Sequence, residues 1–175
     1  MSCQSRYPSE KLVPYDPCWP ERYAEIAARL VGGLGPQWAV EHVGSTSVPG
    51  LLAKPVIDLA LRLPAGQRLA DWDEPFQALG WTGRIEIGDH EALFLLDGSV
   101  RMAIAHVFTA NQWPYAHPRL FADWLRTHTS DRDVYARIKM ELVDHGIWGS
   151  EYTSPRRPSY RMSPLAPEPR SVLLR

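Results

Sequence analysis

The chain has 175 residues, of which 45% are hydrophobic and 22% charged, and this suits one domain with a sizeable core. Its formal net charge of −1 argues against general binding of nucleic acid, because proteins that coat DNA or RNA are usually clearly basic. No apolar run approaches the ~18 residues that span a bilayer, and the first residues lack the apolar stretch of a signal peptide. We therefore expect a cytoplasmic protein without a membrane partner, whose oligomeric state the sequence leaves open.

The first elements along the chain are an arm, a helix and a short strand. Residues 1–12 are polar, and we expect them to form a flexible arm. Apolar residues then recur at helical spacing from residue 20 to residue 34, which predicts an amphipathic helix. Pro20 suits its first turn, because that position needs no amide donor. Residues 38–43 are β-prone and predict a short strand.

The next segment joins a small-residue loop to a buried strand. Residues 44–50 read Gly-Ser-Thr-Ser-Val-Pro-Gly, which is a loop by composition. Residues 55–63 are almost continuously apolar, as in a central strand that is covered on both faces. One carboxylate, Asp58, interrupts this run.

The remainder of the chain alternates helical and strand patterns and then becomes rich in proline. We expect a helix over residues 67–79, strands over 81–87, 92–96 and 100–108, and helices over 118–127 and 131–143. Asp97-Gly98 predicts a tight hairpin between the last two strands. We expect residues 13–153 to form a single domain and residues 154–175 to form a proline-rich tail.

The loop and the carboxylate together indicate phosphate and metal chemistry. A charged group inside a buried strand costs several kcal/mol unless it is paired, bound to metal or near an exposed end. Small loop residues let backbone amides approach a triphosphate, and the hydroxyls of Ser45, Thr46 and Ser47 suit phosphate oxygens, while Asp58 suits Mg²⁺. The competing interpretation is a loop that only turns the chain, with Asp58 capping a backbone group or pairing with an arginine.

Several segments resemble the GrpB family, also called UPF0157. The resemblance is carried by residues 41–51 and 53–58, with support from residues 13–19 and from residues 121–128 with Tyr135 and Lys139, over roughly residues 12–153. It implies an α/β (α+β) fold with a nucleotidyltransferase-like mixed β-sheet flanked by helices and followed by a helical C-terminal part. It also implies that the Gly44-Ser45 motif binds nucleotide phosphates. The resemblance places the chain in the nucleotidyltransferase superfamily. In that superfamily, two closely spaced carboxylates and a third on a later strand hold two metal ions, which assist attack on the α-phosphate of a nucleoside triphosphate.

The sequence departs from that carboxylate pattern. Asp58 matches the first acid, but Ala60 stands at the second, and the later strand carries His106 where a third metal ligand is expected. His106 could hold one metal ion together with Asp58, or act as a base near neutral pH. It could equally be a core histidine bonded to the backbone.

Other candidates flank these positions. Glu41 is a candidate metal ligand, and His42 is either a catalytic or loop-supporting group or an ordinary strand residue. Alternation along a strand directs Glu41 and His42 to opposite faces. Lys54 could add positive charge, and Lys139 reaches either a phosphate or a surface salt bridge. The acidic segment Glu86, Asp89, His90 and Glu91 reads as a solvated turn.

We therefore predict a metal-assisted transferase that moves a nucleotidyl group from a nucleoside triphosphate to a small-molecule acceptor, with Mg²⁺ as cofactor. Because the carboxylate set is incomplete, two alternatives stay open. One is a non-catalytic module that binds a nucleotide or small molecule. The other is a biosynthetic enzyme that uses the same pocket for different group transfer.

Overall fold

A computed structural model describes residues 12–146 of the chain. The expectations for the N-terminal arm, for the end of the domain beyond residue 146 and for the proline-rich tail therefore fall almost entirely outside the described residues. The helices are α1 Trp19–Leu34, α2 Asp73–Ala78, α3 His117–Thr127 and α4 Thr129–Asp144. Within the described part of the chain, no helix is both long and apolar enough to cross a bilayer.

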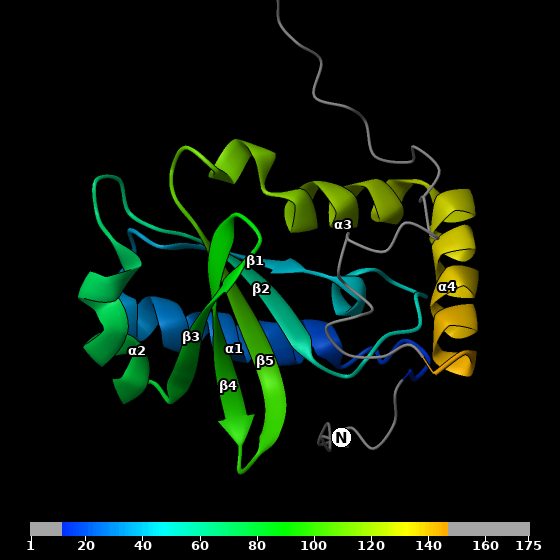
Figure 1. Ribbon diagram of the computed structural model, residues 1–175, viewed down its shortest axis with the longest axis horizontal. Coiled ribbons are helices and arrows are strands. Elements are labelled where there is room, and N and C mark those ends of the chain that lie inside the picture. The colour runs from blue at the N-terminus through cyan, green and yellow to red at the C-terminus, as the bar shows by residue number, and fades with distance from the viewer. Residues whose placement is uncertain (1–11, 147–175) are drawn as a thin grey trace, which may run out of the picture.

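One mixed sheet organises the domain (Figure 1). Its strands are β1 Ala39–Val43, β2 Ile57–Arg62, β3 Trp81–Ile87, β4 His90–Asp97 and β5 Val100–Phe108. Their order across the sheet is β1-β2-β5-β4-β3, with β2 and β5 parallel and every other neighbouring pair antiparallel. The predicted buried strand is thus an inner strand, between β1 and β5.

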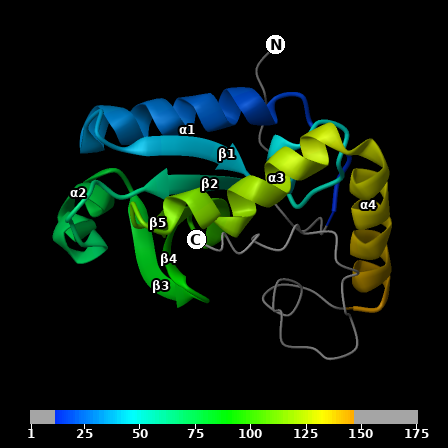
Figure 2. The same ribbon diagram turned by 90° about the horizontal axis from the view of Figure 1, so that it is seen from above.

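Alternation along β2 decides which side chains face which helices. Leu59 and Leu61 pack in the main core with Trp19 and Leu30 of α1, whereas Ala60 packs in a second cluster on the opposite face. Figure 2 shows α1 and α3 on opposite sides of the β1–β2 pair. Asp58 shares the orientation of Ala60, so it points to the α3 face of the sheet.

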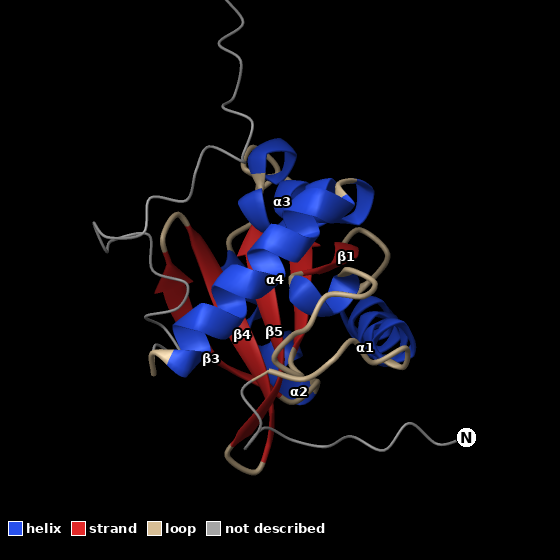
Figure 3. Ribbon diagram, turned by 90° about the vertical axis from the view of Figure 1, so that its right-hand side faces the viewer, coloured by secondary structure: helices blue, strands red, loops and turns tan. Residues whose placement is uncertain are grey.

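A third apolar cluster attaches the C-terminal helices to the loop after β1. Val48 and Leu51 of that loop are buried against Ala122 and Leu125 of α3, with Tyr135 of α4 packed beside them. Figure 3 shows α4 beside the ends of the inner strands, near this loop. The loop between β1 and β2 is therefore enclosed by both C-terminal helices.

Two expected elements differ from the structure. The helix expected over residues 67–79 is a 3₁₀ turn, Leu69–Trp72, followed by the short helix α2. Pro75 has no amide hydrogen to bond to the carbonyl of residue 71, so an α-helix cannot continue through it from the N-terminal side. In addition, β4 begins at His90 rather than at residue 92, which moves His90 from the expected turn into the sheet.

Candidate functional site

The site begins where the loop after β1 passes over Asp58. Val43 is the antiparallel partner of Asp58, so the next residue, Gly44, lies beside the carboxylate. Gly44 has φ 67° and ψ −174°, a backbone region that is essentially restricted to glycine. A Cβ atom at this position would lie 2.8 Å from Cβ of Asp58 and 2.9 Å from its Cγ. The glycine therefore allows the loop and the carboxylate to touch.

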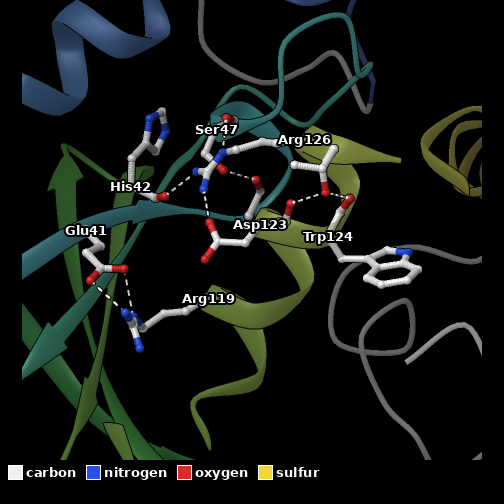
Figure 4. A network of polar contacts seen from close by, with 9 residues as sticks. Glu41, His42, Ser47, Arg119, Asp123, Trp124 and Arg126 are labelled. Carbon is white, nitrogen blue, oxygen red and sulfur yellow. Dashed lines mark hydrogen bonds and ion pairs between the residues drawn. The ribbon is translucent and has the colours of Figure 1, made fainter. Parts of the chain in front are cut away.

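Arg126 of α3 holds the loop in this conformation. Its Nε donates to the carbonyl oxygen of Ser47 over 3.0 Å, and one terminal nitrogen donates to the carbonyl oxygen of His42 over 2.7 Å (Figure 4). The other terminal nitrogen pairs with Asp123 at 2.5 Å. Ser47 closes the 3₁₀ turn by donating from its hydroxyl to the carbonyl of Gly44. The planar guanidinium thus bridges the backbone on both sides of Gly44.

Lys139 of α4 contacts the same loop at Ser45 and Leu52. Its side chain is buried, and its Nζ donates to Oγ of Ser45 over 2.8 Å and to the carbonyl of Leu52 over 2.6 Å. Burial lowers the pKa of Lys139 to about 7, although the charge of Asp58 opposes this shift. Tyr135, one turn earlier, also hydrogen-bonds Ser45, and burial raises the pKa of its phenol. The alternative prediction of a surface salt bridge for Lys139 is wrong, because its side chain is buried inside the molecule.

His106 stands beside Asp58 at the start of a longer series of contacts. Its Nε2 lies 3.8 Å from Oδ1 of Asp58, and its Nδ1 lies 2.9 Å from Nε2 of His90. Nδ1 of His90 lies 3.0 Å from Oδ1 of Asp89. Burial lowers the pKa of His90, and the hydrogen bond from His90 lowers the pKa of Asp89, which favours a neutral ring beside an ionised carboxylate. The alternative of a histidine held by the backbone is wrong, because His106 is bonded to another ring.

Glu41 and His42 point to opposite faces, as expected, and neither is free to act on a ligand. Both carboxylate oxygens of Glu41 accept from Arg119 of α3, over 2.7 and 2.8 Å (Figure 4). The ring of His42 stacks on Tyr23 of α1, and its Nε2 lies 3.0 Å from Oγ1 of Thr46. Burial, with Arg126 nearby, lowers the pKa of His42 to about 4. We therefore correct Glu41 from a metal ligand to an ion-pair partner, and His42 from a catalytic group to a support for the loop.

The remaining candidates define what the site can hold. No three acidic, histidine or cysteine side chains converge on a metal position within residues 12–146. Lys54 is half-buried, and its pKa is lowered by burial and by Arg101 while Asp58 raises it, so it belongs to the same electrostatic neighbourhood. A small hollow of about 40 Å³ adjoins the loop. It is lined by Gly44, Ser45, Val48, Phe121, Ala122, Leu125 and Tyr135.

Comparison with known proteins identifies the family of this chain. The model of the family described as GrpB protein matches residues 10–161. The chain belongs to the GrpB family. A UPF0157 protein of Halalkalibacterium halodurans is 38% identical over 135 residues, which cover 77% of this chain and 69% of the relative. A UPF0157 protein of Pseudomonas aeruginosa is 35% identical, over 76% of this chain and 57% of its own length.

Solved structures extend the likeness to the fold. GrpB from Enterococcus faecalis superposes with a TM-score of 0.69 at 25% identity, covering 81% of this chain and 88% of that one. The Cid1 poly(U) polymerase, described with MgATP bound, gives a TM-score of 0.55 at 11% identity, over 78% of this chain and 46% of its own. The last likeness concerns the fold alone. Together with the mixed sheet and its flanking helices, these structures confirm the expected nucleotidyltransferase-like fold of this GrpB-family chain.

Proposed function

We propose that this GrpB-family chain is a nucleotidyltransferase that moves a nucleotidyl group from a nucleoside triphosphate to a small-molecule acceptor. The contact between Gly44 and the carboxylate of Asp58 carries this proposal, because a small-residue loop there lies directly beside an acid of the kind that suits Mg²⁺. The fold shared with Cid1 supports the same assignment.

Residues of the loop and of α4 are suited to bind different parts of a triphosphate. The hydroxyl of Ser45 and the loop amides are suited to bond phosphate oxygens. Lys139, already in contact with Ser45, would supply positive charge. Because its pKa is about 7, an approaching phosphate would favour the protonated form over the neutral one.

Asp58 fits one magnesium ion that arrives with the nucleotide. Mg²⁺ is commonly held by one or two carboxylates together with substrate phosphates, and the side chain of Asp58 is 28% exposed. When bound, the ion would neutralise charge on the phosphates. A pair of ions fits poorly, since Ala60 replaces the second acid and Glu41 is engaged by Arg119.

Calorimetric titration with ATP, GTP, CTP and UTP, with and without Mg²⁺, tests the binding step. We expect Mg²⁺-dependent binding of at least one triphosphate, which Asp58→Asn abolishes. The matched control is Asp71→Asn, since Asp71 is an exposed carboxylate in the 3₁₀ turn beside α2. Absence of binding to any triphosphate by the unaltered chain contradicts the proposal. Pyrophosphate release in the presence of small hydroxyl and amine acceptors then tests transfer.

A second candidate function, a nucleotide-binding module without transfer, is favoured by one observation. Ala60 follows Asp58 on the same strand face and leaves the acidic pair incomplete. A chain that binds Mg²⁺ and triphosphate tightly, yet releases no pyrophosphate with any acceptor, would support this second function over the first.

A further inference from the structure

The hydroxyl of Ser45 lies among more partners than phosphate binding explains. Its Oγ lies 2.8 Å from Nζ of Lys139, and it also hydrogen-bonds the phenol of Tyr135. The two partners come from adjacent turns of α4, while Ser45 belongs to the loop after β1. Phosphate binding accounts for the lysine, but neither for a phenol on the same oxygen nor for the apolar hollow beside it.

The surroundings of Lys139 favour an uncharged amine. Lys139 is only 2% exposed, and its two described hydrogen-bond partners, Oγ of Ser45 and the carbonyl of Leu52, carry no charge. Burial accordingly lowers the pKa of Lys139 to about 7, although the charge of Asp58 opposes the shift. A neutral amine has two hydrogens and one lone pair. With one hydrogen on the carbonyl of Leu52, the lone pair can accept the hydroxyl proton of Ser45.

Tyr135 and the backbone of the loop prepare Ser45 to lose that proton. Burial raises the pKa of the Tyr135 phenol, so the phenol stays protonated and can donate to Oγ of Ser45 as negative charge develops there. Arg126 holds the backbone on both sides, at the carbonyls of His42 and Ser47. A hydroxyl on a fixed backbone, with a base and a hydrogen-bond donor at its oxygen, is the arrangement that nucleophilic catalysis requires.

The hollow of about 40 Å³ beside Ser45 indicates which chemical group fits there. Apart from Gly44 and Ser45, its lining is apolar or aromatic and consists of Val48, Phe121, Ala122, Leu125 and Tyr135. A water molecule requires about 10–15 Å³ of such space, so the hollow admits about three atoms of that size. Phosphate oxygens gain nothing from these walls, whereas the alkyl end of a short acyl group buries apolar surface against them.

We propose that Ser45 is a nucleophile that takes a short acyl group, of acetyl or propionyl size, from an ester, with Lys139 as its general base. Oγ of Ser45 bonds to the carbonyl carbon, and the hydroxyl proton passes to Nζ of Lys139. The bond from the carbonyl carbon to the ester oxygen then breaks, and the alcohol leaves with that proton. Water attacks the acyl-serine, Lys139 returns the proton of the water to Oγ, and the carboxylic acid leaves.

This activity goes beyond nucleotidyl transfer and does not rest on it. Acylation uses the neutral form of Lys139, whereas phosphate binding uses the protonated form. The same contact between Lys139 and Ser45 therefore serves different chemistry in its two protonation states.

Reaction of the full chain with p-nitrophenyl acetate, followed by acid quenching and peptide mass mapping, tests the nucleophile. We expect release of p-nitrophenol and an acetyl group on Ser45, at a rate that rises with pH and levels off above the pKa of Lys139, about 7. Ser45→Ala should abolish both, and Ser99→Ala, at an exposed serine in the hairpin between β4 and β5, is the matched control. p-Nitrophenyl octanoate should react about 10- to 200-fold more slowly, because its chain exceeds the hollow.

Two variants of Lys139 separate a base from a phosphate ligand. Lys139→Arg keeps a positive charge but cannot be deprotonated, and Lys139→Met keeps an unbranched apolar stem without the amine. Each should slow acetylation of Ser45 by about 10²- to 10⁴-fold. Calorimetry should show that Lys139→Arg still binds nucleotide with Mg²⁺, which distinguishes loss of the base from loss of the charge.

Three results with the unaltered chain would overturn the proposal: p-nitrophenol release no faster than in buffer, acetyl groups only on residues other than Ser45, or a rate that keeps rising with hydroxide well above the pKa of Lys139. These results decide the matter even if a variant fails to fold. An unchanged rate in both lysine variants would remove Lys139 as the base. Because Mg²⁺-dependent nucleotide binding is measured separately, either proposal can fail while the other persists.

Discussion

Replacing Gly44 by alanine tests whether close packing of the loop on Asp58 is built into the fold. The substitution adds one methyl group at φ 67° and ψ −174°, where residues with a side chain are strained. That methyl group would also overlap Asp58, with contacts of 2.8 Å to Cβ and 2.9 Å to Cγ. The carboxylate cannot stay where it is, so stability and nucleotide binding should fall together.

Two costs add in this variant. The backbone strain amounts to about 1–3 kcal/mol, and forcing a methyl group into a packed position adds about 1–3 kcal/mol. We therefore expect Gly44→Ala to lower the free energy of unfolding by roughly 2–6 kcal/mol. For a chain of this length, where 1 kcal/mol shifts the melting temperature by about 2–4 °C, the midpoint should fall by about 4–24 °C.

Urea denaturation followed by tryptophan fluorescence measures the loss, and Gly66→Ala is the control. Gly66 also has a positive φ, of 76°, but no atom lies within 4 Å of an added Cβ. It should show the backbone cost alone, about 1–2 kcal/mol. If Gly44→Ala destabilises the chain no more than Gly66→Ala does, the contact with Asp58 is not a tight one and our reasoning is refuted.

Three further predictions concern the residues around the loop. The folded pKa of Lys139, about 7, lies below its usual 10.5, so the unfolded chain binds more protons between these values and stability rises with pH there. Urea titrations from pH 7 to 9 should show this rise in the unaltered chain and a smaller one in Lys139→Met; parallel profiles would contradict it. Arg126→Lys should cost about 1–3 kcal/mol in the same assay, because one ammonium cannot bridge both loop carbonyls; an unchanged midpoint would contradict it. A double-mutant cycle of Glu41→Gln and Arg119→Met should give a coupling of about 1 kcal/mol that shrinks at high salt; no coupling would show that the pair is inert.

Most elements were predictable because their signals are local. The helical spacing before Gly32-Gly33 and the apolar run around Asp58 each lie within one element, and the structure has α1 and β2 at these places. The loop motif likewise specifies its own turn, since Gly44 provides a conformation that few other residues adopt.

The site could be predicted only in part, because its contacts join distant segments. Glu41 and Arg119 are 78 positions apart, and nothing near Glu41 indicates that its carboxylate is engaged. His90 and His106 meet because β4 and β5 are neighbours, with His106 opposite Ala92. A sequence without pairing information cannot distinguish a histidine in a solvated turn from one that begins a strand. Only the alternation along β4, read from residue 90 rather than 92, could have indicated it.

The different surroundings of Glu41 and Asp58 show how one sheet face can hold a structural acid and a reactive one. Both carboxylates point toward α3, yet Glu41 meets an arginine, which stays charged at every accessible pH. The described neighbours of Asp58 are different in kind: His106 at 3.8 Å, and Lys54 and Lys139, which share its electrostatic surroundings. Among the described residues, no guanidinium engages both oxygens of Asp58 as Arg119 engages those of Glu41. A carboxylate with 28% of its side chain exposed and no such two-point partner can accept an arriving cation, which a binding site requires and a structural ion pair does not allow.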